Sequence, residues 1–227
     1  MLKNGKVLAI IPARGGSKEL PRKNILMAKE KPLIWYSFSS AVKSKNIDRV
    51  ILSSDDNEII SVAENFGLEA PFKRPKNLAD DETSTFDVIS HALKKLPGYQ
   101  YVVLLQPTSP LRTHSDIDNC LEKLELYNAP ACVSVVEPKH RPEWMFTVDK
   151  KDRLTPVMDK LSIRSRRQDL NKTFSLNGAV YAARVDWLMD KKSFLSEGCI
   201  ASIMPPERSL DIDTLFDFQL FLKYLNE

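Results

Sequence analysis

The sequence has 227 residues, of which 43% are hydrophobic and 28% are charged. A chain of this length and composition can bury a sizeable core, so we expect one folded domain over residues 1–227 rather than disorder. The 33 basic and 30 acidic residues leave a net charge of +3, which is too small to favour a nucleic acid or an anionic membrane as a partner. The sequence shows no signal-like or membrane-spanning apolar run, so we expect a cytoplasmic protein.

Four apolar runs rich in β-branched residues are typical of strands that are buried on both faces. These runs lie at residues 6–11, 49–53, 101–105 and 131–136. Segments with helical spacing lie among them, at residues 33–44, 57–66, 85–96 and 116–127. The alternation predicts a three-layer, Rossmann-like α/β fold with a mostly parallel sheet, in which ligands bind beyond the carboxyl ends of the strands.

The pattern changes after the fourth strand. Residues 138–174 form a polar stretch with prolines and arginines, which is too long for an idle connection and is predicted to be an inserted excursion. Strand character returns at residues 177–183, residues 201–204 suggest a short edge strand, and residues 214–225 suggest a closing amphipathic helix.

The loop after the first strand combines paired glycines with basic side chains. Gly15 and Gly16 allow backbone N–H groups to approach an anion closely. The loop also offers charge-assisted hydrogen bonds to phosphate from Arg14, Lys18, Arg22 and Lys23. Neither GxxxxGK[ST] nor GxGxxG is present, which disfavours a P-loop NTPase. The alternative is a solvated basic loop whose glycines only turn the chain.

Two aspartates near the end of the chain suggest a metal site. Asp211 and Asp213 are two residues apart, so in an extended segment both carboxylates point to the same side. Such a pair suits Mg²⁺, which bridges carboxylates to substrate phosphates. Alternatively, Asp213 or Thr214 caps the following helix, and both interpretations can hold together.

Five collinear motifs resemble the acylneuraminate cytidylyltransferases, the CMP–sialic acid synthetases, over nearly the whole chain. They are IPARGGSK at 11–18 with LPRKN at 20–24, RP at 74–75 and LA at 78–79 leading to TST at 83–85, LLQPTSPLR at 104–112, NGAVY at 177–181 and SLDID at 209–213. Glu19 departs from the family pattern, which often has glycine there, and its charge would repel a triphosphate unless the side chain points away.

The resemblance implies a fold of the nucleotide-diphospho-sugar transferase type and a specific reaction. CMP from CTP would be joined to the anomeric hydroxyl of a nine-carbon keto acid, a nonulosonic acid of the sialic acid type, with release of pyrophosphate. Mg²⁺ would be the cofactor. In such enzymes the excursion reaches the active site of a second subunit, which implies a homodimer with residues 138–174 as its dimerisation arm.

The resemblance also implies roles for individual residues. The catalytic residues would be Arg14, Lys18, Asp211 and Asp213, of which Asp211 and Asp213 would bind the metal. The nucleotide-binding residues would be Arg14, Gly15, Gly16, Ser17, Lys23, Asn24, Arg74 and Thr85. The sugar-binding residues would be Gln106, Asn177, Tyr181 and, on the excursion, Arg167.

Several alternatives stay open at the level of sequence. In the first alternative, the acid substrate would be legionaminate or pseudaminate instead of sialic acid. Kdo is less favoured, because Kdo-activating enzymes have a different first loop and lack the run at 106–112. A guanylyltransferase of the same architecture is a further enzyme alternative. A non-catalytic module that binds a nucleotide sugar is disfavoured, because binding alone does not need both Asp211 and Asp213.

Overall fold

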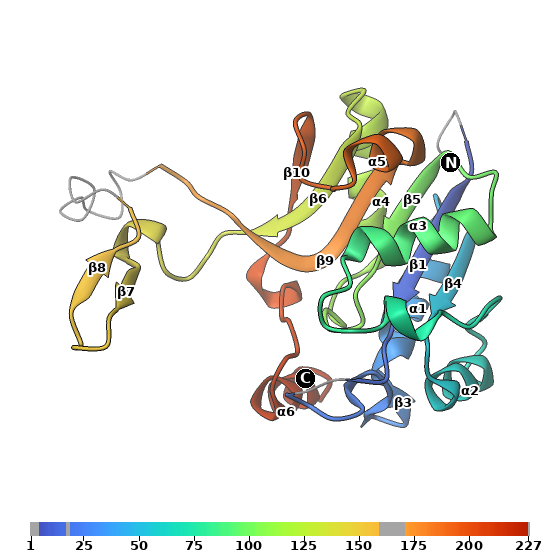
Figure 1. Ribbon diagram of the computed structural model, residues 1–227, viewed down its shortest axis with the longest axis horizontal. Coiled ribbons are helices and arrows are strands. Elements are labelled where there is room, and N and C mark those ends of the chain that lie inside the picture. Colours follow the sequence, from blue (N-terminus) through green and yellow to red (C-terminus); the bar gives the residue numbers. More distant parts are fainter. Residues whose placement is uncertain (1–4, 17–18, 159–170, 227) are drawn as a thin grey trace.

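The computed structural model describes residues 5–16, 19–158 and 171–226. Its main sheet has six strands in the order β10-β6-β9-β5-β1-β4 (Figure 1). The strands are β1 (Val7–Pro12), β4 (Arg49–Ser53), β5 (Tyr101–Leu104), β6 (Ala131–Val136), β9 (Ser175–Arg184) and β10 (Cys199–Ile203). Only β9 runs antiparallel to its neighbours in this sheet. The predicted mostly parallel sheet is therefore confirmed, with β10 at an edge.

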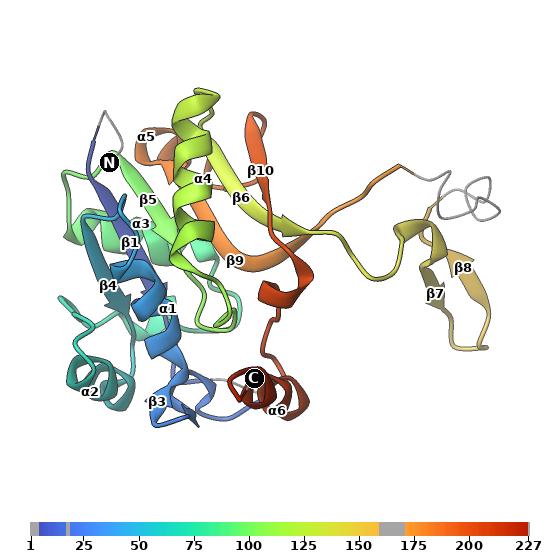
Figure 2. The same ribbon diagram turned by 180° about the vertical axis from the view of Figure 1, so that it is seen from behind.

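Helices cover both faces of the sheet, as Figures 1 and 2 show from opposite sides. They are α1 (Leu33–Val42), α2 (Asn57–Asn65), α3 (Thr85–Lys95), α4 (His114–Leu126), α5 (Val185–Lys191) and α6 (Leu215–Tyr224). Alternate residues of β1 face opposite layers: Ile11 packs in the core with α1, α2 and α4, and Ile10 packs in the core with α3 and α5. The three-layer α/β fold is thus confirmed.

A third, smaller core joins the beginning and the end of the chain. It contains Leu20 from the first loop, Ala28, Ile212 and two phenylalanines of α6, Phe218 and Phe221. Ile212 lies between the two aspartates singled out in the sequence and is fully buried. The burial of this one apolar side chain therefore brings the acidic segment against the basic loop.

The smaller elements were not predicted from the sequence. They are a hairpin of β2 (Met27–Ala28) and β3 (Lys31–Pro32), a hairpin of β7 (Phe146–Val148) and β8 (Leu154–Pro156), and the 3₁₀ helices η1 (Lys23–Ile25), η2 (Lys76–Leu78), η3 (Pro142–Trp144) and η6 (Pro206–Arg208). The turn of the first hairpin has positive φ at Lys29 and Glu30. Such turns usually carry Asn or Gly, so no local signal predicts this turn.

The excursion leaves the sheet between the end of β6 and the start of β9. Its β7–β8 hairpin projects away from the body of the molecule in both views (Figures 1 and 2). Arg141 stabilises the base of this arm, because its guanidinium pairs with Glu137 at 2.8 Å and donates to the carbonyl of Asn171 at 3.4 Å. Within the described residues, no helix is long and apolar enough to cross a membrane.

Candidate active site

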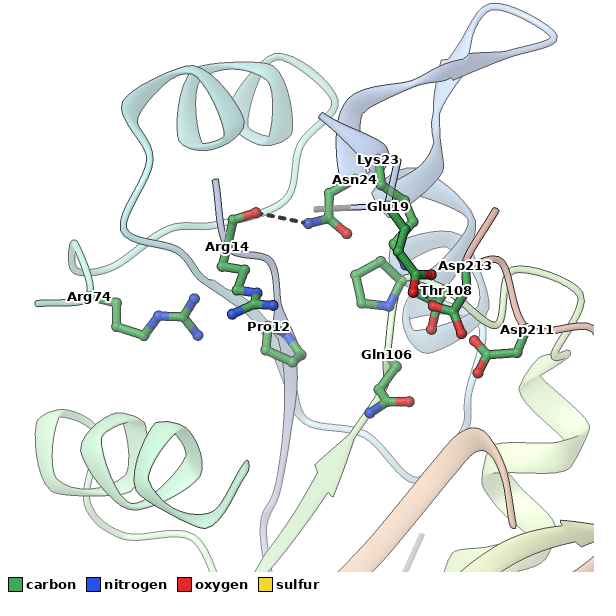
Figure 3. A pocket seen from close by; sticks show the side chains of 11 residues that line it. Pro12, Arg14, Glu19, Lys23, Asn24, Arg74, Gln106, Thr108, Asp211 and Asp213 are labelled. Carbon is green, nitrogen blue, oxygen red and sulfur yellow. Dashed lines mark hydrogen bonds and ion pairs between the residues drawn. The ribbon is translucent and has the colours of Figure 1, made fainter. Parts of the chain in front are cut away.

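A cavity of about 540 Å³ lies beyond the carboxyl ends of β1 and β5 (Figure 3). Four segments that are distant in the sequence contribute its walls. The lining residues are Pro12, Arg14, Glu19, Lys23, Asn24, Arg74, Gln106, Pro107, Thr108, Asp211 and Asp213. The structure therefore brings the predicted basic loop and the predicted aspartate pair together around one cavity.

Charge is unevenly distributed around this cavity. Figure 3 shows Arg14 and Arg74 on one side, which we call the basic wall. Glu19, Asp211 and Asp213 lie on the opposite side, which we call the acidic wall. A ligand that carries phosphates next to a divalent cation matches such a distribution.

The first loop is fixed by the two aspartates that follow β4. The backbone N–H of Gly15 donates to Asp55 Oδ1 at 3.2 Å. A Cβ at position 15 would lie 2.6 Å from Asp56 Oδ2, so a larger residue there would have to displace the Asp56 side chain. At Gly16 a Cβ would meet no atom within 4 Å. Of the two glycines, Gly15 is the one that the packing of the loop requires.

Each arginine of the basic wall forms an ion pair with an aspartate of the same chain. Arg14 Nη1 lies 2.8 Å from Asp81 Oδ1, and the side chains are 36% and 45% exposed. Arg74 is buried and lies 3.6 Å from Asp55 Oδ1. Burial lowers the pKa of Arg74, and the charge of Asp55 opposes this shift. In both pairs an aspartate carboxylate is bound to an arginine side chain that could bind phosphate in its place.

Arg22 and Asn24 serve the loop itself. Arg22 binds Asp56 at 2.7 Å and also pairs with Glu58, so it is directed to the start of α2, and it is not one of the cavity-lining residues. Asn24 is buried and donates from Nδ2 to the carbonyl oxygen of Arg14 at 3.2 Å. Asn24 thereby fixes the backbone at Arg14, as the dashed line in Figure 3 marks.

The acidic wall is extended, as the spacing of its aspartates predicted. Asp211 and Asp213 both line the cavity, and Ile212 between them is buried on the other side. The N–H of Ile212 donates to the carbonyl oxygen of Thr108 at 2.8 Å. Asp213 Oδ1 lies 2.9 Å from Lys23 Nζ, which connects the acidic segment to the basic loop.

The capping alternative is also present, but on the neighbouring residue. Thr214 is the N-cap of α6 and forms a capping box with Asp217. Asp213 is therefore free of the capping role, and its carboxylate faces Lys23 and the cavity. Burial raises the pKa of Asp211, and the charge of Asp213 raises it further, against the hydrogen bond from Thr108.

Gln106 lies between the two walls (Figure 3). Its position depends on Gly178 of β9, whose φ is +73° and whose Cβ, if present, would lie 2.7 Å from Gln106 Oε1 and 3.7 Å from Asp211 Oδ2. A side chain at position 178 would thus displace the Gln106 side chain, whereas Asp211 would remain at an ordinary contact distance. Gly178 belongs to the NGAVY motif at 177–181, but the sequence alone predicts no role for it.

A second cavity of about 260 Å³ shares Gln106 with the first. Its lining includes two predicted site residues, Thr85 and Tyr181. The remaining lining residues are Ser84, Phe86, Leu104, Leu176, Lys192, Ser193, Phe194 and Leu195. Thr85, predicted to bind nucleotide, therefore lies beside Tyr181, predicted to bind sugar, and the nucleotide role of Thr85 stays a prediction.

Asn177 occupies a different environment from the one predicted. It is buried, and its Oδ1 accepts from Ser134 Oγ at 2.6 Å while its Nδ2 donates to Ser209 Oγ at 2.9 Å. It lines neither of the two cavities. These bonds connect β6 and β9 to the acidic segment, so the contacts support a positioning role, and its sugar contact stays a prediction. Ser17, Lys18 and Arg167 lie outside the described residues.

The donor set on the acidic wall fits Mg²⁺. Among the described residues no group of three or more histidine, cysteine, aspartate or glutamate side chains forms a complete metal site. Mg²⁺ does not require one, because it keeps several waters and is commonly held by one or two carboxylates together with substrate phosphates. Asp211 and Asp213, which both line the open cavity, supply that number of carboxylates.

Proteins similar to this chain are cytidylyltransferases. The family model described as Cytidylyltransferase matches residues 8–196. Pseudaminic acid cytidylyltransferase of Campylobacter jejuni subsp. jejuni serotype O:2 is 36% identical over 225 residues, covering 97% of this chain and 96% of that protein. N-acylneuraminate cytidylyltransferase of Escherichia coli O18:K1:H7 is 34% identical over 215 residues, covering 95% of this chain and 51% of that protein.

A third relative and a solved structure extend the comparison. CMP-N,N'-diacetyllegionaminic acid synthase of Legionella pneumophila subsp. pneumophila is 31% identical over 227 residues, covering 97% of this chain and 96% of that protein. The CTP complex of CMP:2-keto-3-deoxy-manno-octonic acid synthetase shares the fold, with a TM-score of 0.74 at 18% identity over 97% of this chain and 98% of that one. The chain belongs to the cytidylyltransferase family.

Proposed function

We propose that this protein transfers CMP from CTP to the anomeric hydroxyl of a nonulosonic acid and releases pyrophosphate, with Mg²⁺ as cofactor. The observation that carries the proposal is the single cavity in which Arg14 and Arg74 face Asp211 and Asp213 across Gln106. The family membership and the names of the relatives support the same reaction.

The basic wall would bind the triphosphate. Arg14 would exchange Asp81 for phosphate oxygens. This exchange would cost little free energy, because the present ion pair is exposed to water. Lys23, now bound to Asp213, lies where it can contact both the phosphates and the acidic wall. These side chains would orient the α-phosphorus for in-line attack and stabilise the negative charge that develops on the phosphate oxygens.

The acidic wall would hold the metal through Asp211 and Asp213. When bound, Mg²⁺ neutralises phosphate charge and stabilises the pyrophosphate leaving group. The hydrogen bond from Ile212 to Thr108 and the burial of Ile212 keep both carboxylates in place before the metal arrives. Gln106, between the walls, would contact the acid.

The second cavity favours a particular kind of acid. Leu104, Leu176 and Leu195 line it, together with the rings of Phe86, Tyr181 and Phe194. Apolar walls favour methyl groups over hydroxyls, at about 0.8 kcal/mol for each buried methyl-sized group. We therefore favour an acid with acetamido methyl groups to bury, and pseudaminate or legionaminate derivatives are candidates beside N-acetylneuraminate.

The proposal includes a homodimer formed through the arm. Val148 and Leu154 are cross-strand neighbours on the β7–β8 hairpin and are 61% and 64% exposed. Exposed apolar side chains on a projecting hairpin are typical of a surface that a partner covers. Light scattering coupled to size exclusion should give a dimer for the wild type and a monomer for Leu154→Asp. A monomeric wild type would contradict the proposed dimer.

The reaction is tested by pyrophosphate release. CTP, ATP, GTP and UTP are each combined with Mg²⁺ and with N-acetylneuraminate, a pseudaminate or a legionaminate. Of the four nucleotides, we expect only CTP to release pyrophosphate, and only when an acid is present. Release with GTP would instead support a guanylyltransferase. CTP binding without release in any combination would support a non-catalytic module.

A further inference from the structure

The last residue of the run at 106–112 is a buried arginine that the proposed reaction does not use. The side chain of Arg112 is 3% exposed. Its Nη1 donates to Ser37 Oγ at 2.6 Å, and its Nη2 donates to the backbone carbonyl oxygen of Gln106. Burial lowers the pKa of Arg112 to about 9, against the charges of Asp116 and Asp211.

Stability does not explain a cation in this place. Both hydrogen-bond acceptors of Arg112 are neutral oxygens, so the burial of its charge is only partly compensated. Even a complete buried ion pair is weak evidence for stability, and among the described residues Arg112 has no carboxylate bonded to it. The role of Arg112 therefore lies in the groups that its two hydrogen bonds hold in place.

Those bonds converge on one peptide group beside the cavity. The carbonyl oxygen of Gln106 accepts from Arg112, from Ser37 Oγ at 3.2 Å and from the N–H of Ser109 at 3.3 Å. The same turn binds β9, because Ser109 Oγ donates to the carbonyl oxygen of Asn177 at 3.2 Å. The turn also binds the acidic wall through Thr108 and Ile212.

We propose that Arg112 is a positioning residue for cytidylyl transfer: its guanidinium clamps the carbonyl of Gln106 and so holds the Gln106 side chain between the basic and acidic walls. Arg112 does not line the cavity and acts only through Gln106 and its turn. This inference rests on the proposed function, because Gln106 is the group that would contact the acid.

Arg112→Met removes the clamp, and Arg112→Lys retains part of it. In Arg112→Met we expect kcat to fall about 100-fold, since a misplaced contact group costs about that much, while the melting temperature falls by no more than a few degrees. A lysine can still donate one hydrogen bond to the carbonyl oxygen. The kcat of Arg112→Lys should therefore be about tenfold higher than that of Arg112→Met, which corresponds to about one hydrogen bond. Arg49→Met is the matched control, because Arg49 pairs with Glu69 at the opposite end of β4.

A double-mutant cycle with Gln106→Ala separates positioning from general damage. If Arg112 acts through the Gln106 side chain, Arg112→Met should lower kcat about threefold or less in the Gln106→Ala background, because coupled residues are not additive. A full 100-fold loss in that background would overturn the inference. So would an Arg112→Met enzyme whose kcat stays within about threefold of the wild type.

Amide hydrogen exchange gives a readout that does not need turnover. Exchange at the amides of Thr108, Ser109 and Leu111 should be faster in Arg112→Met than in the wild type, and unchanged in Arg49→Met. If the wild type releases no pyrophosphate with any acid, the proposed function fails, and exchange alone still decides whether Arg112 orders this turn. Unchanged exchange in Arg112→Met would overturn the clamp.

Discussion

The two walls of the cavity are built in different ways. The basic wall depends on side-chain tips, since Arg14 reaches Asp81 in an exposed ion pair and Arg74 reaches Asp55 at 3.6 Å. The acidic wall depends on the backbone and the core, since Ile212 is fully buried and its N–H is bonded to Thr108.

The difference matches what each wall would bind. Exposed ion pairs contribute little stability, so Asp81 can be exchanged for phosphate at little cost. Metal ligands act best when packing and hydrogen bonds hold them before the ion binds. We therefore call the basic wall the exchangeable wall, after Arg14, and the acidic wall the fixed wall, after Asp211 and Asp213.

The largest effect is expected on the fixed wall. Asp211→Ala should lower kcat about 1,000-fold or more, because a ligand of the proposed metal is removed. The fold and the proposed dimer should persist, since the carboxylate lines a cavity and not the core. Pyrophosphate release, melting temperature and light scattering measure the three properties. Asp190→Ala is the control, because the Asp190 side chain on α5 is 71% exposed. Near-normal rates at saturating Mg²⁺ would remove Asp211 from the metal site.

On the exchangeable wall, Arg14→Ala should raise the KM for CTP and lower kcat together. The combined loss in kcat/KM should be about 100-fold, because a charge-assisted contact to phosphate is lost in both the ground state and the transition state. Steady-state kinetics with CTP as the varied substrate measure it, with Arg49→Ala as the control. An unchanged kinetic profile would mean that the triphosphate binds elsewhere.

The support of the fixed wall can be weakened without touching the cavity. Asp116 is buried and accepts two hydrogen bonds from Arg208 at 2.9 and 2.8 Å, next to Ser209 and the acidic segment. Asp116→Asn should cost about 2 kcal/mol of unfolding free energy at neutral pH; a half-exposed arginine partner reduces the larger loss expected for a fully buried pair. Urea unfolding measures it.

The contribution of Asp116 should depend on pH. Burial raises its pKa, but the hydrogen bonds from Arg208 and Thr113 outweigh burial and leave the pKa below its usual value. A depressed carboxyl pKa stabilises the folded state above the unfolded pKa of about 3.9, and this stabilisation is lost as the pH falls through the folded pKa. The difference between wild type and Asp116→Asn should therefore shrink below about pH 4. A difference that grows in acid would contradict this sign.

The smallest effect concerns Glu19, which lines the cavity on the acidic wall and does not point away from it. Glu19→Gln removes a like charge from the region of the phosphates, so the KM for CTP should fall about threefold at low salt and by less at high salt. Glu197→Gln is the control, because Glu197 does not line this cavity. A rise in KM would indicate that Glu19 helps to bind the cation.

Much of the fold could be predicted because its signals are local. The apolar runs and helical spacing located the strands and the larger helices, and the carboxyl-end rule located the cavity. The β2–β3 turn escaped because Lys29 and Glu30 adopt positive φ without glycine or asparagine. Helix α5 escaped because it starts at Val185, directly after β9 ends at Arg184, with no loop to mark the change.

In the site, too, the features with a local sequence signal could be predicted and the others could not. The spacing of Asp211 and Asp213 predicted a shared face, and glycines beside basic residues predicted the loop. The parts that escaped depend on contacts between distant segments. Gly178 is required by the close approach of Gln106, and Asn177 is hydrogen-bonded to Ser134 and Ser209. No local pattern encodes such contacts, so only the folded chain reveals them.

The central claim is that the two walls bind one Mg²⁺–CTP together. Calorimetric titration of CTP into the wild type and into Asp211→Asn/Asp213→Asn, each with and without Mg²⁺, tests it most directly. We predict that Mg²⁺ tightens CTP binding to the wild type by about tenfold or more, which is at least about 1.4 kcal/mol, and that the double variant loses this gain. Equal tightening by Mg²⁺ in both proteins would contradict the account.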